Sequence, residues 1–310
     1  MFEIKRYDSA LVSDWNFVVE NSKNGNFLHL TNYFKYHEDR FHDASLIVYK
    51  KNKPVAVFPS NKVDGVVYSH SGLSYAGLIY GKELSCKSVL DIFESIIEHY
   101  RVSSVVKIIY KCIPDVFSRY PSGEDLYALF RHNATLIRRD VSSVIELSAV
   151  PKLSDSRKCV IRKAEKNDVT FCSGVDVEAF YGLLTSVLAK FSVVPVHTLA
   201  ELNTLIDRFP SNIKVFGAVK DGELLSGALV YDFGHIVHTQ YLGASDEGRK
   251  VGALDFVLNE LVSKVYSNKK YFSFGISTEN GGRYLNEGLI AQKEGFGARA
   301  VVHDFYEIKI

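Results

Sequence analysis

One order of secondary-structure elements occurs twice in this chain and limits the folds open to it. The second half has a strand hairpin at 213–231, a strand at 235–242, a helix from Leu254 and a strand at 271–275. The first half shows the same order, and its helix and last strand precede their counterparts by about 164 positions. Such a constant offset indicates two copies of one α/β unit, although two unrelated α/β patterns could agree by chance.

The two copies predict two domains. The link at 148–151 divides the chain into an N-terminal domain of residues 1–148 and a C-terminal domain of residues 149–310. The second copy has the richer glycine loop and a polar cluster after its last strand. We therefore expect the chemistry in that copy or in the cleft between the two copies.

Composition and charge exclude several classes of protein. The chain has 310 residues, 46% of them hydrophobic, and a net charge of +1, which is typical of a globular protein without a global attraction to nucleic acid. It has neither a signal-peptide core at its N-terminus nor an apolar run of membrane-span length. Its four cysteines form no metal-binding spacing, which predicts reduced, mostly buried thiols. These features predict a cytoplasmic protein with no membrane span, no DNA partner and no metal.

A glycine-bearing loop between a strand and a helix is the first candidate site. The segment Glu247–Ala253 follows the strand at 235–242 and precedes the helix at Leu254. Free backbone N–H groups and a helix dipole at such a place favour an anion, so the loop predicts a pyrophosphate site. It lacks the Gly-Lys-Ser/Thr of a Walker loop and the GxGxxG of a dinucleotide site.

A strongly basic helix is expected from the capping residue Ser154 to about Asn167. Lys158, Arg162 and Lys166 fall on one of its faces at i, i+4 and i+8, while Cys159 and residues 161–164 are expected to turn inward. The basic face is either a solvated surface or an anion-binding wall for a phosphorylated substrate or an RNA end.

Four further residues are candidates for acid, base or oxyanion roles. Glu279 follows a strand end and His197 lies in a loop after Pro195, so either could be a general base. His238 is expected to share a strand face with Gln240, opposite Tyr241, and could equally be a buried, satisfied histidine. Lys293, beside paired glycines, could stabilise an oxyanion or could be a surface turn lysine.

Two other patterns carry no function. Gly72–Ala76 is similar to a nucleophile elbow but ends in alanine, and no acid–histidine pair follows it at a telling position. The many tyrosines and phenylalanines are scattered and do not form an RNA-binding pattern.

The polar motifs of the second half resemble those of Fem-type aminoacyltransferases and their acyl-CoA-using relatives, which are tandem GNAT folds. The resemblance covers about Ser154 to Tyr306, while the first half matches only in its order of elements. It rests on the basic segment 156–167, His238-x-Gln240-Tyr241, Gly252-Ala253-Leu254-Asp255, Phe274-Gly275-x-Ser277-Thr278-Glu279, Leu285-Asn286-x-Gly288-Leu289 and Lys293-Glu294-x-Phe296-Gly297.

The resemblance implies a fold, a mechanism and a set of contacts. Each copy would be a GNAT-like unit, a mixed and mostly antiparallel sheet flanked by helices. An acceptor amine would attack the acyl donor directly, without a covalent enzyme intermediate, and Tyr241 would join Glu279, His197 and Lys293 as a catalytic candidate. The donor would contact Gln240, Tyr241, Leu242, Gly248, Arg249, Lys250, Val251, Gly252 and Ala253, and the acceptor would contact Lys158, Arg162, His238, Asp255, Ser277, Thr278 and Asn286.

The resemblance also bears on the substrates. Fem enzymes usually carry an aromatic residue before the matching lysine and often an inserted helical arm, whereas this chain has Gln292 and no visible insertion. This favours acyl-CoA as donor. Relatives of this shorter kind are linked to amino-sugar and surface-polysaccharide modification, which implies a nucleotide-linked amino sugar as acceptor. A homodimer is compatible with this interpretation. Transfer from an aminoacyl-tRNA to a peptidoglycan precursor is the alternative, and a non-enzymatic binding module that kept the fold is a third hypothesis.

Overall fold

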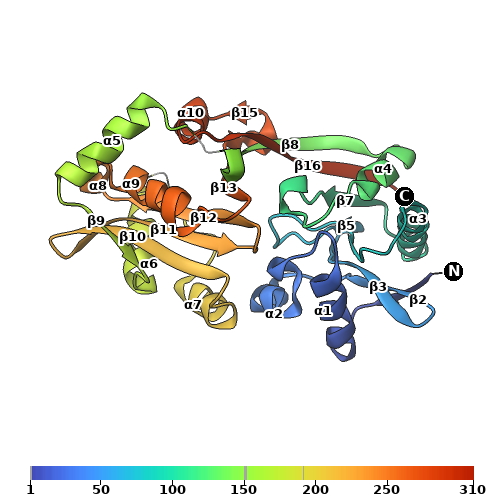
Figure 1. The fold of residues 1–310 in the computed structure, drawn as a ribbon. Coiled ribbons are helices and arrows are strands. Elements are labelled where there is room, and N and C mark those ends of the chain that lie inside the picture. The colour runs from blue at the N-terminus through green and yellow to red at the C-terminus, as the bar shows by residue number, and fades with distance from the viewer. Residues whose placement is uncertain (1, 150–151, 191) are drawn as a thin grey trace. The chain divides into compact units, whose positions relative to one another are not determined.

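The chain divides into two compact units, which are described separately (Figure 1). The computed structural model describes residues 2–149, 152–190 and 192–310. Unit 1 comprises the residues up to Asp140 with Asn280–Arg283 and Val302–Ile310, and unit 2 comprises Val141–Glu279 and Tyr284–Val301. The single boundary expected after residue 148 is wrong, because the C-terminal strand returns to pair within unit 1.

Unit 1 contains one antiparallel sheet and one short mixed set of strands. The sheet has the order β1-β2-β3-β6, and the second set has the order β4-β5-β7-β16, in which β5 and β7 are parallel. Helix α3 connects β5 to β7, and its buried face forms much of the core of unit 1. The elements are β1 Glu3–Arg6, α1 Val12–Asn21, α2 Thr31–Phe34, β2 Leu46–Lys50, β3 Lys53–Phe58, β4 Asn61–Val63, β5 Val66–Tyr68, β6 Ile79–Tyr80, α3 Cys86–Val102, β7 Lys107–Lys111, α4 Glu124–Arg131 and the end of β16 Arg299–Lys309.

Unit 2 is built on a sheet of order β8-β13-β12-β11-β10-β9. Only β12 and β13 are parallel, and the helix between them crosses over the sheet. The elements are β8 Thr135–Glu146, α5 Asp155–Lys166, β9 Thr170–Ser173, α6 Val177–Ala189, α7 Leu199–Arg208, β10 Ile213–Lys220, β11 Glu223–Asp232, β12 Ile236–Ala244, α8 Asp246–Val251, α9 Ala253–Glu260, a π-helix Leu261–Val265, β13 Tyr271–Ile276, β14 Thr278–Glu279, β15 Tyr284–Leu285 and α10 Glu287–Gly295.

The repeated order of elements corresponds to a repeated parallel crossover. In unit 1, Val67 pairs with Ile108 across β5 and β7, and in unit 2, Val237 pairs with Phe272 across β12 and β13. The expected Asp221-Gly222 turn joins β10 and β11 with both residues at positive φ. Residues 27–41 consist of short helical pieces interrupted at Leu30 and again at His37, rather than one continuous helix.

Helices cover both faces of the sheet of unit 2 (Figure 1). Helices α5 and α9 pack on one face, where Ile161, Val257 and Phe272 belong to one buried core. Helices α6 and α7 lie against the other face. Two glycines paired in register, Gly227 and Gly243, lie against Phe180 and Leu184 of α6 and allow its close approach.

The tightest of these contacts is at Gly227. A Cβ atom there would lie 2.5 Å from the ring of Phe180, which is fully buried. Side chains cannot approach that closely, so the sheet needs glycine where α6 crosses it.

None of the helices in the described residues is long and apolar enough to cross a bilayer. The expectation of mostly buried thiols is wrong. Cys86 and Cys159 are exposed and Cys172 is half-buried, while only Cys112 is buried.

We expect Gly227→Ala to lower the free energy of unfolding by about 1–3 kcal/mol, because the new methyl group displaces Phe180. The matched control is Gly182→Ala in α6, where a Cβ atom meets no atom within 4 Å. That change should stabilise the helix by up to about 1 kcal/mol. Urea unfolding followed by circular dichroism measures both, and equal effects of the two variants would contradict the packing argument.

Candidate functional site

The sheet of unit 2 opens between β12 and β13. The two strands pair only from Ile236–Tyr271 to His238–Ser273. Beyond this point β12 continues along β11 to Ala244, while β13 stays with β8. The edge of β12 from Thr239 onward therefore has no strand partner on its β13 side in the described part of the chain. Such an edge offers backbone N–H and C=O groups to a ligand.

Two contacts hold the strands at the point of separation. His238 Nδ1 lies 3.0 Å from the hydroxyl of Ser273, which is fully buried. Gly275 follows at a φ of 76°, and a Cβ atom there would lie 3.3 Å from the His238 ring. The turn of β13 away from β12 thus needs glycine for both its backbone conformation and its contact with His238.

A β-bulge at Gln240 changes the faces of β12. Thr239 pairs with Val230 and Tyr241 pairs with Leu229, so Gln240 is the extra residue. The strand alternation is shifted by one position, and His238 and Tyr241 lie on the same face of the sheet. The expectation that they lie on opposite faces is wrong, because that expectation counted an unbroken strand.

Tyr241 and His197 form a hydrogen-bonded pair. His197 Nδ1 lies 2.7 Å from Tyr241 Oη, and the His197 main-chain N–H donates to the same oxygen at 3.3 Å. Burial raises the pKa of Tyr241 above its usual value, so the phenol stays protonated at neutral pH and can exchange a proton with Nδ1 of His197. His197 is positioned by the N-terminus of α7, where Thr198 and Glu201 form a capping box. Two sequence candidates that lie 44 positions apart are thus brought together.

Lys293 is buried and fixes the backbone just after the separation of the strands. Its Nζ donates to the carbonyls of Gly275 and Ile276 and to the hydroxyl of Ser277, at 2.7–2.9 Å. Burial lowers the pKa of Lys293 to about 8. The alternative of a surface turn lysine is wrong. Because three acceptors already occupy the amine, Lys293 positions the end of β13.

Ser277, Thr278, Glu279 and Asn286 gather at the small hairpin of β14 and β15. The Asn286 side chain donates to Glu279 at 2.9 Å, caps α10, and its main-chain N–H donates to Ser277 O. Thr278 accepts from the main-chain N–H of Val141. Glu279 is exposed and close to the separated strands in sequence, and its role as a general base stays a prediction.

The expected glycine loop is wrong in its secondary structure, because Asp246–Val251 forms helix α8. The N–H of Gly248 donates to Ser245 Oγ and that of Gly252 donates to Gly248 O, so neither is free for an anion.

Both glycines of α8 have packing reasons for being glycine. A Cβ atom at Gly248 would lie 2.2 Å from Leu225 O, and one at Gly252 would lie 2.5 Å from Val160. Three residues that were expected to contact the donor have side chains in the hydrophobic core or packed against it, namely Leu242, Val251 and Ala253.

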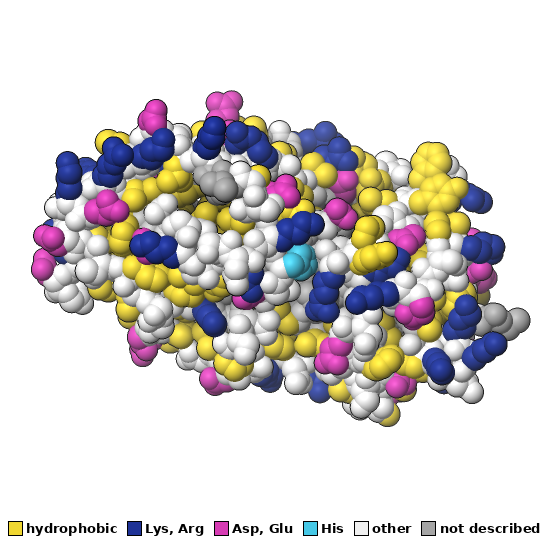
Figure 2. Space-filling view, viewed as in Figure 1, with side chains coloured by type: hydrophobic (Ala, Val, Ile, Leu, Met, Phe, Trp, Pro, Cys, Tyr) yellow, Lys and Arg dark blue, Asp and Glu magenta, His cyan; other side chains and the backbone are white. Residues whose placement is uncertain are grey.

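Helix α5 spans nearly the expected residues and presents its basic face to solvent. Lys158, Arg162 and Lys166 are exposed, and Figure 2 shows Lys and Arg side chains in a row over α5. Cys159 is exposed rather than inward, because Ile161 and Ala164 define the buried face. Arg157, which sequence analysis did not select, forms an ion pair with Asp255 of α9. Asp255 therefore has a partner inside the fold, and its acceptor contact stays a prediction.

Sequence analysis also missed Ser273. The sequence does contain a signal for it, because Ser273 lies inside the apolar strand 271–276. A buried serine in such a strand is expected to have a hydrogen-bond partner. The partner, His238, could not be assigned without the parallel pairing. Among the described residues, no cluster of three or more histidine, cysteine or carboxylate side chains could hold a metal ion.

Comparison with known proteins identifies the fold. No protein-family model and no curated protein matches the sequence. Among solved structures, FemX superposes with a TM-score of 0.68 at 12% identity over 99% of this chain and 97% of that chain. L-PGS from Bacillus licheniformis superposes with a TM-score of 0.64 at 11% identity over 95% and 90%. A tandem GNAT protein from the clavulanic acid biosynthesis pathway gives 0.58 at 10% over 100% and 98%.

The chain has the Fem-like, tandem GNAT fold. The predicted fold class is confirmed: each GNAT unit contains a mixed, mostly antiparallel sheet with helices. At these identities the similarity extends to the fold alone. The separated strands and the His197–Tyr241 pair are the features of this chain that bear on its reaction.

We expect Lys293→Met to lower the free energy of unfolding by about 1–3 kcal/mol at pH 7, because the buried Ser277 hydroxyl and the partly buried carbonyls of Gly275 and Ile276 lose their donor. Lys250→Met is the control, since Lys250 is exposed in the same unit and should change stability by less than about 0.5 kcal/mol. Chemical denaturation measures both variants. A stability of Lys293→Met equal to that of the wild type would show that the amine does not fix the end of β13.

Proposed function

We propose that this protein transfers an acyl group to an amine by direct attack at the separation of β12 and β13. The observation that carries the proposal is the free edge of β12 after His238, together with Tyr241 on the same strand, which is hydrogen-bonded to His197. Backbone N–H groups along such an edge can bind the acyl donor and stabilise the oxyanion of a tetrahedral intermediate.

The His197–Tyr241 pair supplies the proton chemistry of this reaction. The amine nitrogen attacks the carbonyl carbon, the C–N bond forms, and the bond from that carbon to the donor's leaving group breaks. The amine loses a proton and the leaving atom gains one. Tyr241 Oη gives its proton to the leaving atom and takes one from Nδ1 of His197, which lies 2.7 Å away, and the imidazole takes up the proton that the amine loses.

The described residues favour an aminoacyl-tRNA as the donor. The resemblance puts the pyrophosphate of acyl-CoA at 248–253, where Asp246 and Glu247 form the first turn of α8. Arg249 and Lys250 pair with these two carboxylates, and ion pairs with Lys190 and Arg249 hold the pKa of Asp246 below its usual value. This end of β12 therefore offers a pyrophosphate little net positive charge.

The exposed basic face of α5 supports the same donor. Lys158, Arg162, Lys163 and Lys166 present several cations on one helix, which suits the repeated phosphates of RNA better than a single small anion. The superposition on FemX agrees with this choice, since the Fem-type enzymes that the sequence resembles take aminoacyl-tRNA. A peptidoglycan precursor with a free amine is the corresponding acceptor.

Acyl-CoA with a nucleotide-linked amino sugar remains the second candidate, favoured by Gln292 in place of an aromatic residue. The two donors are distinguished by incubating the protein with labelled aminoacyl-tRNAs and amine acceptors, and separately with acyl-CoAs and amino-sugar nucleotides. Label in the acceptor supports the first proposal, and release of a free thiol supports the second. Transfer from neither donor would support a binding module without activity.

Tyr241→Phe should lower kcat by about a hundredfold or more with little change in KM, because it removes the proton donor and leaves the ring in place. Tyr266→Phe is the matched control, since that hydroxyl is buried in unit 2 without a hydrogen-bond partner. Its activity should equal that of the wild type. Steady-state kinetics with the active donor measure kcat and KM of both variants. Full activity of Tyr241→Phe would show that the His197–Tyr241 pair does not transfer the proton.

Charge reversal on α5 tests the tRNA contact. The double variant Arg162→Glu and Lys166→Glu should weaken tRNA binding by about tenfold or more and flatten its salt dependence, because phosphate contacts are lost. Lys214→Glu, an exposed lysine on β10, is the control and should bind as the wild type does. Filter binding at several salt concentrations measures both, and unchanged affinity of the double variant would exclude α5 from the contact.

A further inference from the structure

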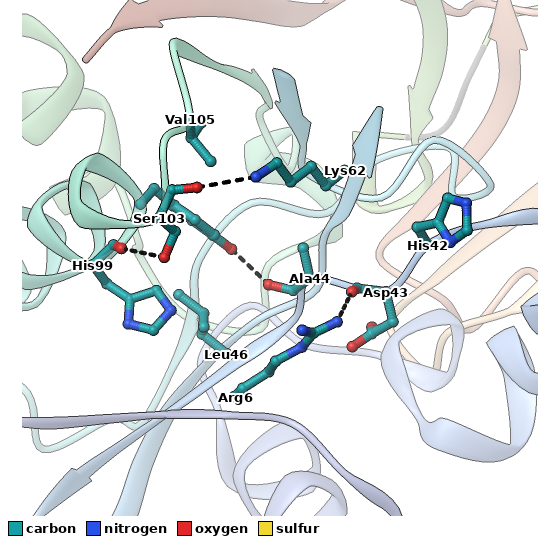
Figure 3. A pocket seen from close by; sticks show the side chains of 10 residues that line it. Arg6, His42, Asp43, Ala44, Leu46, Lys62, His99, Ser103 and Val105 are labelled. Atoms are coloured by element: carbon teal, nitrogen blue, oxygen red, sulfur yellow. Dashed lines mark hydrogen bonds between the residues drawn. The ribbon is translucent and has the colours of Figure 1, made fainter. Parts of the chain in front are cut away.

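A cavity of about 570 Å³ lies wholly within unit 1. Its wall is formed by β1, the segment before β2, β4 and the C-terminal end of α3 (Figure 3). The volume is in the range of sites for small molecules. No residue of this cavity belongs to the acyl-transfer site proposed for unit 2.

Two cations line the cavity, and the hydrogen bonds that each of them makes go to neutral groups. Arg6 Nη2 donates to Asp43 O at 2.6 Å, and Lys62 Nζ donates to Ser103 O at 3.1 Å. Both acceptors are neutral carbonyls, and no ion pair of Arg6 or Lys62 is recorded among the described residues. In Figure 3 the two side chains reach toward the cavity from opposite sides. Each keeps N–H groups that a bound anion can accept from.

One carboxylate also lines the cavity, and it is held by its own loop. Asp43 accepts from the Ser45 hydroxyl at 2.6 Å and from the Ser45 N–H at 3.3 Å. Its charge offsets one of the two cations, so Arg6, Lys62 and Asp43 together carry a formal charge of +1. Burial and the nearby Arg6 lower the pKa of His99, which keeps that imidazole neutral at pH 7.

Apolar side chains form the cavity wall beside the two cations. Ala44, Leu46 and Val105 are buried at the cavity wall. Tyr100 lies beside them with its hydroxyl already bonded to Ala44 O at 2.7 Å and to Ser60 at 2.8 Å, so it contributes its ring. An apolar wall with a few charged groups is the arrangement that binds amphipathic small molecules.

We propose that this cavity binds a small carboxylic acid with a compact apolar body, in its anionic form. The carboxylate lies between Arg6 and Lys62, and the body lies against Leu46, Val105 and the ring of Tyr100. A single carboxylate matches the formal charge of Arg6, Lys62 and Asp43 together, and a dianion would be repelled by Asp43.

The test uses benzoate as the probe and the full-length protein. Isothermal titration calorimetry should detect benzoate binding, and benzamide, which has the same shape without the charge, should bind at least about tenfold more weakly. Absence of benzoate binding, or equal binding of benzamide, would overturn the proposal.

Charge variants locate the site. Lys62→Met and Arg6→Met should each weaken benzoate binding by about tenfold, while Asp43→Asn should tighten it, because it removes the only negative charge of the lining and can still accept from Ser45. The control is Lys82→Met, an exposed lysine of unit 1 outside the cavity, which should bind as the wild type does. Tightening cannot come from a damaged fold, so Asp43→Asn remains decisive even if another variant unfolds. If neither the Asp43→Asn variant nor the Lys62→Met variant changes the affinity for benzoate, the benzoate site lies outside this cavity.

Discussion

The contact between His238 and Ser273 lies where the sheet of unit 2 opens, and the candidate site depends on it. It closes the last paired position of β12 and β13, and Gly275 then turns β13 away. Lys293 donates hydrogen bonds to the carbonyls of Gly275 and Ile276, which this turn removes from pairing with β12. The Ser277 hydroxyl that binds the same amine is buried, so the lysine stabilises the turn that leaves the edge of β12 open.

Unit 1 uses the same device with a different result. The Lys111 amine donates to the carbonyls of His70, Ser71 and Leu73, and burial lowers its pKa to about 8. Here, however, the chain after β5 stays bonded to β7, since Ser69 N–H donates to Ile109 O and Ala76 N–H donates to Lys111 O. In the described residues, β5 and β7 therefore leave no open edge between them comparable to that of β12. This difference supports placing the chemistry in unit 2.

The sequence predicted the repeated crossover, the Asp221-Gly222 hairpin and the basic helix, because these follow from local periodicity and turn chemistry. It selected His197, Tyr241 and Lys293, but it could not pair them. The bulge at Gln240 shifts every later side chain of β12 to the other face, and no residue of the strand signals it. The glycines at 248 and 252 resemble an anion-binding loop in the sequence. In the structure these positions need glycine because a side chain would collide with Leu225 and Val160.

By itself, the sequence determined the kinds of elements, their order and the fold class, because hydrophobic periodicity and turn residues act over short distances. Tertiary structure decided everything that depends on neighbours from distant parts of the chain. It returned β16 to unit 1, brought His197 to Tyr241, and gave Asp255 the partner Arg157. It also limited the pairing of β12 with β13 to three positions, because strand pairing is set by packing between separate segments. Because the pairing ends there, the rest of β12 has a free edge, and this edge is the candidate acyl-transfer site.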